Sequence, residues 1–172
     1  RILTSLNLDE AQWAAKKVQW FINQQKDEGI RPHQIANTQD PYTKTLIRIY
    51  QAYEDICVRN GVIDFAELIL RSYDLFIKNP EILQHYQERF RHILVDEFQD
   101  TNTIQYAWLK LLGGEKSCLM IVGDDDQSIY GWRGARVKNI QDFTRDFPEN
   151  QVIRLEQNYR STGVILAAAN AL

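Results

Sequence analysis

The sequence has few cysteines, no long apolar run and no excess of positive charge, and each shortage excludes a class of protein. Its two cysteines, Cys57 and Cys118, lie far apart without metal-ligand spacing, so we expect reduced core residues, as in cytosolic proteins. No stretch approaches the ~20 apolar residues of a membrane span, and we expect no signal peptide. A net charge of −3 gives no overall attraction to nucleic acid, so nucleic-acid binding would need a local basic patch.

The overall composition fits a folded globular protein. Apolar residues make up 44% of the sequence, an ordinary fraction for a folded domain. The length of 172 residues suits one domain, or one domain and part of another. The chain starts at Arg1 instead of methionine, and it stops at Leu172 within the helix-like run ILAAANAL, where no capping residue follows. We therefore expect the sequence to be a piece of a longer protein.

Helical periodicity dominates the first ~60 residues. Two helices are expected, with a polar loop between them from Gln24 to about Tyr42. Residues at helical spacing mark one face of each helix: Trp13, Lys16, Lys17, Trp20 and Phe21 in the first, and Leu46, Ile49, Tyr50, Tyr53, Ile56 and Cys57 in the second. The second helix should end at Asn60-Gly61, because glycine closes helices readily.

Capping signals predict further helices after this point. Asp64-x-x-Glu67 is expected to be a capping box for a helix that reaches residue 77, and Asn79-Pro80 separates this helix from the next. We place a domain boundary here, with an all-helical part in residues 1–62 and a different part in residues 63–172.

From residue 93 the pattern changes to alternation of strands and helices. Three strands are predicted, at residues 93–95, 118–122 and 152–155. Three helices follow them: one over residues 104–112, stopped by Gly113-Gly114; one that carries Val137, Ile140 and Phe143; and one capped by Ser161-Thr162. This order predicts right-handed crossovers and a parallel sheet in an α/β fold. The first strand is wholly apolar, which is typical of a strand buried on both faces.

Each predicted strand ends in polar residues, and parallel strands would bring these ends to one edge of the sheet. Asp96 and Glu97 follow the first strand. One carboxylate there can hold a hydrated Mg²⁺, and the other can orient and deprotonate a water molecule, as nucleotide hydrolysis requires. The plainer alternative is that these acids only begin a loop and cap the helix near Thr101.

The two later clusters fit the same chemistry. Gln127 follows three acids after the second strand and could contact a γ-phosphate without adding negative charge, although a solvated turn is the alternative. Arg160 follows the third strand and could meet a phosphate with its planar guanidinium, while Tyr159 could stack on a base. A surface ion pair is the alternative for Arg160.

The segment YGWRGAR at residues 130–136 is the most unusual part of the sequence. Trp132 lies between glycines in a polar loop, where a base of single-stranded nucleic acid could stack on it for roughly 1–3 kcal/mol. Arg133, Arg136 and Lys138 add local positive charge. Packing of Trp132 in a core, with arginines on the surface, is the alternative. Because the segment follows Gln127 closely, a shift at the phosphate could reach Trp132.

These residues resemble motifs of the superfamily 1 DNA helicases of the UvrD/Rep/PcrA type. Three segments match helicase motifs in order: DEFQDTN at residues 96–102 resembles motif II, VGDDDQSIYGWRGA at 122–135 resembles motif III, and LEQNYRS at 155–161 resembles motif IV. QKDEGIRPH at 25–33 and DFAELIL at 64–70 are also similar to this family. The resemblance covers essentially the whole chain.

The resemblance implies roles at an ATP site. Asp96 would coordinate Mg²⁺ through water, and Glu97 would be the general base for the attacking water. Gln127 would contact the γ-phosphate. Tyr159 would stack on adenine, and Arg160 would stabilise charge on the γ-phosphate.

The resemblance also implies a DNA site and a domain plan. Trp132 would stack on a base of single-stranded DNA, with Tyr130 and Arg133 supporting the contact. Residues 63–172 would form part of the RecA-like, P-loop NTPase motor domain termed 1A, and residues 1–62 part of the helical insertion termed 1B. The partners would be single-stranded DNA and single-strand/duplex junctions, and the location the bacterial cytoplasm, at the nucleoid.

The chain departs from the family in extent, because we find in it no GxxxxGK[ST] phosphate loop and expect no second motor domain within it. That loop supplies backbone amides and a lysine for the β- and γ-phosphates. We therefore expect this chain alone to bind ATP weakly and not to hydrolyse it at a useful rate, with a sheet that lacks the strand bearing the loop.

Two other functional classes stay open from the residues. One is a two-metal hydrolase that uses Asp96, Glu97, Asp100 and Asp124 on a phosphodiester. The other is a binding module that uses Trp132 without catalysis. The direction of movement along DNA, 3′→5′, is implied by the resemblance alone.

Overall fold

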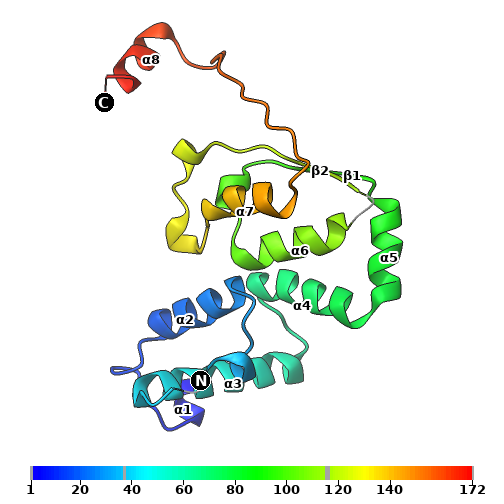
Figure 1. Ribbon diagram of the computed structural model, residues 1–172. Coiled ribbons are helices and arrows are strands. Elements are labelled where there is room, and N and C mark those ends of the chain that lie inside the picture. The colour runs from blue at the N-terminus through cyan, green and yellow to red at the C-terminus, as the bar shows by residue number, and fades with distance from the viewer. Residues whose placement is uncertain (1, 37, 115–116, 172) are drawn as a thin grey trace.

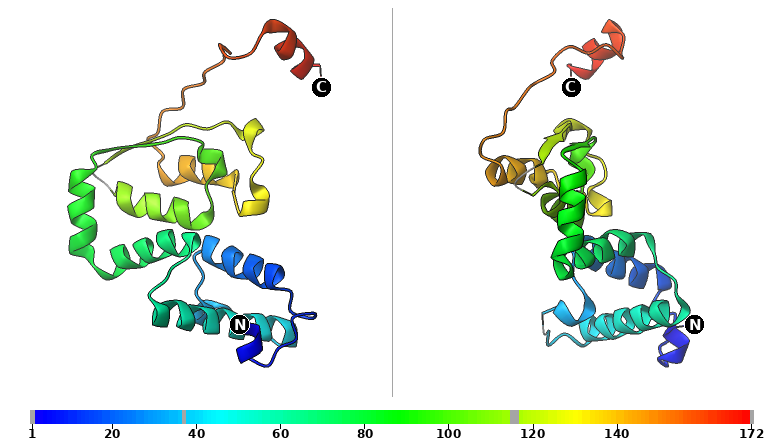
Figure 2. Two further views of the ribbon diagram at one scale, coloured as in Figure 1. Left: turned by 180° about the vertical axis from the view of Figure 1, so that it is seen from behind. Right: turned by 90° about the vertical axis from the view of Figure 1, so that its right-hand side faces the viewer.

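The computed structural model describes residues 2–36, 38–114 and 117–171 (Figure 1). Its elements, in chain order, are α1 (Ile2–Ser5), α2 (Ala15–Asp27), η1 (Pro32–Gln34), α3 (Pro41–Asn60), α4 (Phe65–Lys78), α5 (Pro80–Arg89), β1 (His92–Val95), η2 (Phe98–Asp100), α6 (Thr103–Gly113), β2 (Cys118–Ile121), η3 (Asp125–Gln127), η4 (Gly131–Arg133), α7 (Lys138–Asp146) and α8 (Gly163–Ala169), where η marks a 3₁₀ turn. The helices α1 to α4 lie at one end, and β1, β2, α6 and α7 form the next part (Figures 1 and 2). No described helix combines the length and apolar composition that crossing a bilayer requires.

The parallel pairing expected of the first two strands is confirmed. β1 and β2 run parallel, with His92 opposite Cys118 and Val95 opposite Ile121, and α6 connects them. Side-chain burial alternates along both strands. Every second side chain packs against the aromatic core that includes residues of α6 and α7, while Leu94 is 72% exposed on the other face of the sheet. The expectation that β1 is buried on both faces is therefore wrong, because helices cover one face of this described sheet. Cys118 is exposed as well, whereas Cys57 is in the core.

The predicted third strand does not form. Residues 152–155 run as an extended segment that leads away from β1 and β2 towards α8, and their apolar side chains are exposed (Figure 1). The described sheet has only the two strands β1 and β2. Strand propensity states only that a segment suits a pleated, half-buried surface, and the segment needs a neighbouring strand edge to form a ladder.

The helical half confirms one predicted boundary and corrects another. α3 ends at Asn60, and Gly61 adopts the left-handed conformation with φ 63°, as the glycine predicted. The polar loop expected from Gln24 onwards is too long, because α2 continues to Asp27 and Pro32–Gln34 forms η1. A core of buried residues holds α1, α2 and α3 together: Leu3, Trp13, Val18, Ile22, Leu46, Ile49 and Tyr50.

A buried ionic network explains why the polar end of α2 is ordered. Lys26, which is 1% exposed, places its Nζ 2.7 Å from Glu54 on α3, 2.8 Å from Asp64 at the start of α4 and 2.9 Å from Glu67 on α4. Arg31 adds ion pairs of 2.9 Å to Glu54 and 2.7 Å to Glu67. An isolated buried ammonium would be expensive, and these carboxylates offset its desolvation.

The network also changes how α4 begins. The side chain of Asp64 accepts a hydrogen bond of 2.7 Å from the backbone amide of Glu67, as a helix cap should. The reciprocal half of the expected capping box is absent, because the Glu67 carboxylate pairs with Lys26, Arg31 and Arg71 instead. Burial alone would raise the pKa of Glu67, but the hydrogen bonds from these cations hold the pKa below its ordinary value.

Helix α4 packs against both halves of the described chain. It contacts α2 on one side and α6 on the other, where the indole of Trp108 donates a hydrogen bond of 2.9 Å to Ser72 and stacks near Phe76. Helix α4, which opens the second predicted part, thus contacts helices of both parts. The division into residues 1–62 and 63–172 stays a prediction.

We expect Lys26→Met to lower the free energy of unfolding by about 3–5 kcal/mol, because it removes the cation that Glu54, Asp64 and Glu67 share and leaves Arg31 alone to pair with Glu54 and Glu67. Urea denaturation measures this change. Arg145→Gln is the control, since Arg145 pairs with Asp142 on the exposed surface of α7 and its loss should move the midpoint little. An unchanged midpoint for Lys26→Met would contradict a stabilising role for the network.

Candidate functional site

The two carboxylates after β1 lie on a strained turn. Asp96 and Glu97 are both exposed, and Glu97 adopts the left-handed conformation with φ 51° and ψ 41°. A residue other than glycine in this region costs of order 1–3 kcal/mol, and such residues concentrate at functional sites. Oδ1 of Asp96 accepts a hydrogen bond of 2.9 Å from the backbone amide of Glu97, which helps to hold this turn.

A buried glutamine links this turn to the loop after β2. Gln99 is 1% exposed, and its Nε2 donates a hydrogen bond of 2.6 Å to Oε2 of Glu97. Its Oε1 accepts a hydrogen bond of 3.1 Å from the backbone amide of Asp124. A Cβ on Gly123 would lie 2.8 Å from the same Oε1, so a larger residue there would have to displace the side chain of Gln99. Gln99 lies within the segment DEFQDTN, but no role for it follows from the sequence, because its burial is a tertiary property.

Backbone hydrogen bonds extend the strand pairing into both loops. The amide of Val122 donates to the carbonyl of Val95 over 2.8 Å, and the amide of Phe98 donates to the carbonyl of Val122 over 2.9 Å. In the second loop, Oδ2 of Asp124 accepts a hydrogen bond of 2.7 Å from Nε2 of Gln127. The structure therefore brings the first two predicted clusters to one edge of the sheet.

The donor set at this edge fits a hydrated Mg²⁺ bound through a single carboxylate. Mg²⁺ prefers oxygen ligands and keeps several waters, so Asp96 can serve with one oxygen. Within the described side chains, Oδ1 of Asp100 is the one buried polar atom that accepts no hydrogen bond, which leaves an oxygen acceptor in the same loop. No three His, Cys, Asp or Glu side chains in the described part of the chain gather closely enough to enclose a metal ion.

The loop that carries Trp132 is exposed. Trp132 is 68% exposed and Tyr130 36% exposed, with their ring centroids 6.4 Å apart. Gly134 closes the turn in the left-handed conformation, with φ 82°. The alternative of a core-packed Trp132 is therefore wrong. The side chain of Arg133 lies outside the described part of the structure.

The end of this loop is fastened to the loop after β1. The amide of Arg136 donates a hydrogen bond of 2.9 Å to the carbonyl of Thr101. Asn139, which is 3% exposed, donates from Nδ2 to the carbonyls of Thr101 and Asn102 over 2.9 and 3.3 Å. The guanidinium of Arg136 pairs with Glu28 at 3.0 Å and so is directed to another part of the protein, whereas the sequence led us to expect it in a basic patch for nucleic acid. Asn139 carried no signal in the sequence.

The third predicted cluster is not brought to this edge. Tyr159 and Arg160 are exposed on the extended segment that leads to α8 (Figure 1). The hydroxyl of Tyr159 donates to the side chain of Gln157 over 3.1 Å, and the amide of Arg160 donates to Oδ1 of Asn158 over 2.9 Å. Convergence through a third strand was therefore a wrong expectation.

The carboxyl group of Asp27, at the end of α2, has a raised pKa. Oδ1 of Asp27, at the end of α2, accepts a hydrogen bond of 2.8 Å from Nδ2 of Asn102, the residue that caps α6. Burial, together with the charge of the adjacent Glu28, raises the pKa of Asp27 to about 6, although the hydrogen bond from Asn102 acts in the opposite direction.

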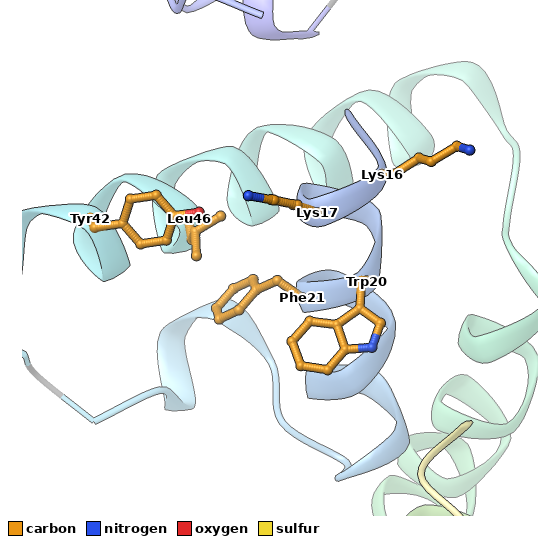
Figure 3. Close-up of a pocket in the computed structure, with 6 residues that line it drawn as sticks. All are labelled: Lys16, Lys17, Trp20, Phe21, Tyr42 and Leu46. Atoms are coloured by element: carbon orange, nitrogen blue, oxygen red, sulfur yellow. The ribbon is translucent and has the colours of Figure 1, made fainter. Parts of the chain in front are cut away.

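A shallow hollow of about 380 Å³ lies between α2 and α3, away from these loops (Figure 3). Its walls are mainly aromatic and aliphatic, and the residues that line it are Lys16, Lys17, Trp20, Phe21, Tyr42 and Leu46. No carboxylate lines it and it lies apart from the loops after β1 and β2, so we assign it no part in the chemistry of the sheet edge.

Known proteins resemble this chain strongly. The model of the UvrD/REP helicase N-terminal domain matches residues 1–148. DNA helicase II of Salmonella typhimurium is 61% identical over 172 residues, and DNA helicase II of Escherichia coli is 60% identical over 172 residues; in each case this is 100% of the chain and 24% of the relative. The ATP-dependent DNA helicase PcrA of Leuconostoc citreum is 42% identical over 173 residues, 23% of its length. The chain thus spans about a quarter of these relatives.

We expect the contribution of Asp27 to the stability of the protein to fall as the pH rises through the range from about 4 to about 6. Over this range the folded state holds a proton that the unfolded state, with its ordinary pKa of 3.8, has released. Asp27→Asn removes this titration and keeps an oxygen that accepts from Asn102. The variant should therefore melt at a higher temperature than the wild type at about pH 7.5, and the difference should shrink at about pH 5.

Thermal unfolding at the two pH values measures this difference. Asp55→Asn, at an exposed carboxylate on α3, is the matched control and should change the melting temperature little at either pH. A stabilisation by Asp27→Asn that does not vary with pH would show that the effect does not come from the titration of Asp27.

Proposed function

The chain belongs to the UvrD/REP helicase family, and from this premise we propose that it forms the water-activating and DNA-gripping part of an ATP-dependent DNA helicase. The observation that carries the proposal is the pair of hydrogen bonds made by Gln99, which joins the loop of Glu97 to the loop that continues to Gln127 and Trp132. The names of the relatives support the same activity, since they are DNA helicase II and the ATP-dependent DNA helicase PcrA.

In the proposed reaction, residues of the sheet edge act on water and on the γ-phosphate. Mg²⁺, held through water by Asp96, would neutralise charge on the phosphates. Glu97 would orient the attacking water and accept its proton, and Gln99 holds the carboxylate of Glu97 for this purpose. Gln127, which is held by Asp124, would donate to a γ-phosphate oxygen without adding negative charge.

The same loop would connect hydrolysis to DNA. Trp132 would stack on a base of single-stranded DNA, with Tyr130 beside it and Arg133 contributing positive charge. Gln127 and Trp132 lie on one short connection after β2, which Gln99 fastens at its start and Thr101 at its end. A change at the γ-phosphate would therefore reach the stacking residue through a few bonds.

Tyr159 and Arg160 take the remaining roles in the proposal. Tyr159 would stack on adenine, and Arg160 would stabilise the charge that develops on the γ-phosphate. Both roles require residues 150–162 to lie beside the sheet edge, in a position different from the extended one in this structure (Figure 1).

The finer parts of the activity follow from family membership. We propose movement along single-stranded DNA in the 3′→5′ direction, entry at single-strand/duplex junctions, and strand separation in DNA repair or replication in the bacterial cytoplasm. The two-metal hydrolase has less support, because the described acids do not gather around a metal ion and both side-chain oxygens of Asp124 accept hydrogen bonds within their own loop.

We expect Glu97→Gln, in the longer protein that contains this chain, to abolish ATP turnover and to leave DNA binding largely intact. The amide is isosteric and can still accept from Gln99, but it cannot accept a proton from water. Steady-state ATPase assays and fluorescence anisotropy with labelled single-stranded DNA measure the two properties. Glu88→Gln, on the exposed surface of α5, is the control. If turnover by Glu97→Gln equalled that of the wild type, the motor interpretation would be abandoned.

We expect Trp132→Ala to weaken the coupling to DNA more than it weakens nucleotide binding. Loss of one stacked base should lower DNA affinity by about 1–3 kcal/mol, and the DNA concentration for half-maximal ATPase stimulation should rise accordingly. Trp20→Ala is the matched control, because Trp20 is 59% exposed on α2 in the separate hollow between α2 and α3. Equal effects of the two substitutions would remove Trp132 from the DNA site.

We expect the 172-residue chain, purified by itself, to show no ATP turnover, with or without single-stranded DNA. It contains no GxxxxGK[ST] sequence to hold the β- and γ-phosphates. Glu97→Gln in the same chain identifies contaminating ATPase, which would survive the substitution. Turnover that DNA stimulates and that Glu97→Gln abolishes would show the expectation to be wrong.

A further inference from the structure

The end of α2 packs into a corner between the two functional loops. We call residues 27–29 the α2 corner. Oδ1 of Asp27 accepts a hydrogen bond of 2.8 Å from Nδ2 of Asn102. Oε2 of Glu28 accepts a hydrogen bond of 3.0 Å from Oγ1 of Thr103, and Oε1 of Glu28 lies 3.0 Å from Nη2 of Arg136. One carboxylate, that of Glu28, thus holds a residue after each loop.

The α2 corner is closely packed on both sides. Gly134, with φ 82°, faces Asp27 so closely that an added Cβ would lie 3.4 Å from the Cβ of Asp27. Gly29, with φ 77°, faces Ile104, where an added Cβ would lie 3.1 Å from Cδ1. A small movement of the Trp132 loop relative to α6 would therefore change the contacts that the α2 corner makes with Gly134 and Ile104.

The residues that the α2 corner binds lie directly after the two functional loops. Asn102 and Thr103 follow the loop of Asp96 and Glu97, and they begin α6. Arg136 follows the Trp132 loop, and its amide binds the carbonyl of Thr101. The α2 corner thus touches the bases of both loops and is placed to set the distance between them.

The α2 corner is itself held in place from behind. Lys26, the residue before Asp27, is fixed by its carboxylates on α3 and α4. Two adjacent half-buried carboxylates repel each other, and burial and this repulsion raise the pKa of Asp27. A charged pair that lowers stability in this way is more typical of a functional position than of a packing contact.

We propose that Asp27 and Glu28 are positioning residues that set the Trp132 loop against the Glu97 loop, so that DNA bound at Trp132 accelerates ATP turnover. This inference rests on the proposed helicase function. It assigns the α2 helix a part in coupling, although the described contacts of α2 reach neither Glu97 nor Trp132.

A charge-reversal cycle in the longer protein that contains this chain tests the inference. Glu28→Arg and Arg136→Glu should each lower ATP turnover in saturating single-stranded DNA by about 5- to 10-fold, and turnover without DNA should change by less than about 2-fold. The double variant should recover most of the stimulation, because the opposite charges meet again. Glu28→Gln, which keeps the acceptor for Thr103 but removes the charge, should lose about 2- to 3-fold.

The control cycle uses the pair of the exposed Arg145 and the half-buried Asp142 on α7, with Asp142→Arg and Arg145→Asp, which should leave both rates unchanged. Each variant's urea unfolding midpoint is measured in parallel, and only variants that fold as the wild type does are compared. A parallel fall of turnover with and without DNA in Glu28→Gln, or a double variant no better than the single ones, would overturn the inference, since a structural contact would act in that way.

Failure of the two proposals can be told apart in the same assay. If the wild-type protein showed no ATP turnover stimulated by single-stranded DNA, the proposed function itself would fail. If the wild-type protein were stimulated and Glu28→Arg, Arg136→Glu and Glu28→Gln were stimulated equally, only the role of the α2 corner would fail.

Discussion

The ammonium group of Lys26 is the constraint around which this chain is arranged. A charge that is 1% exposed is tolerated only where carboxylates surround it, and here they come from α3, from the cap of α4 and from α4 itself. Three helices must therefore meet at one point. Because Asp27 is the next residue, the same constraint places the end of α2 against Asn102 and so against the loops at the sheet edge.

A second polar side chain orders the sheet edge in a similar way. Gln99 is buried, so both ends of its amide need partners, and it finds them in Glu97 and in the backbone of Asp124. Hydrogen bonds are directional, whereas apolar packing allows sliding, so the two loops take one relative position. The strained backbone of Glu97 is compatible with this arrangement, since tertiary contacts hold a conformation that the residue alone would avoid.

The sequence predicted elements wherever the cause is local. Gly61 closes α3, the helix expected over residues 104–112 forms as α6, and β1 and β2 pair in parallel because a helix must connect them. Predictions failed where the cause is distant. Residues 152–155 have the composition of a strand but pair with no strand in the described sheet, and the loop expected from Gln24 is partly helix because Lys26 is bound by residues far along the chain.

The same division applies to the candidate site. The sequence by itself determined the family resemblance, the chemical groups at Asp96, Glu97, Gln127 and Trp132, and their order along the chain, because motifs are local strings of residues. Only the tertiary structure decided that Gln99 and Asn139 hold the loops, that Arg136 pairs with Glu28, and that Tyr159 and Arg160 lie away from the sheet edge. These outcomes depend on burial and on partners distant in sequence, and a linear pattern of residues does not encode which distant groups will meet.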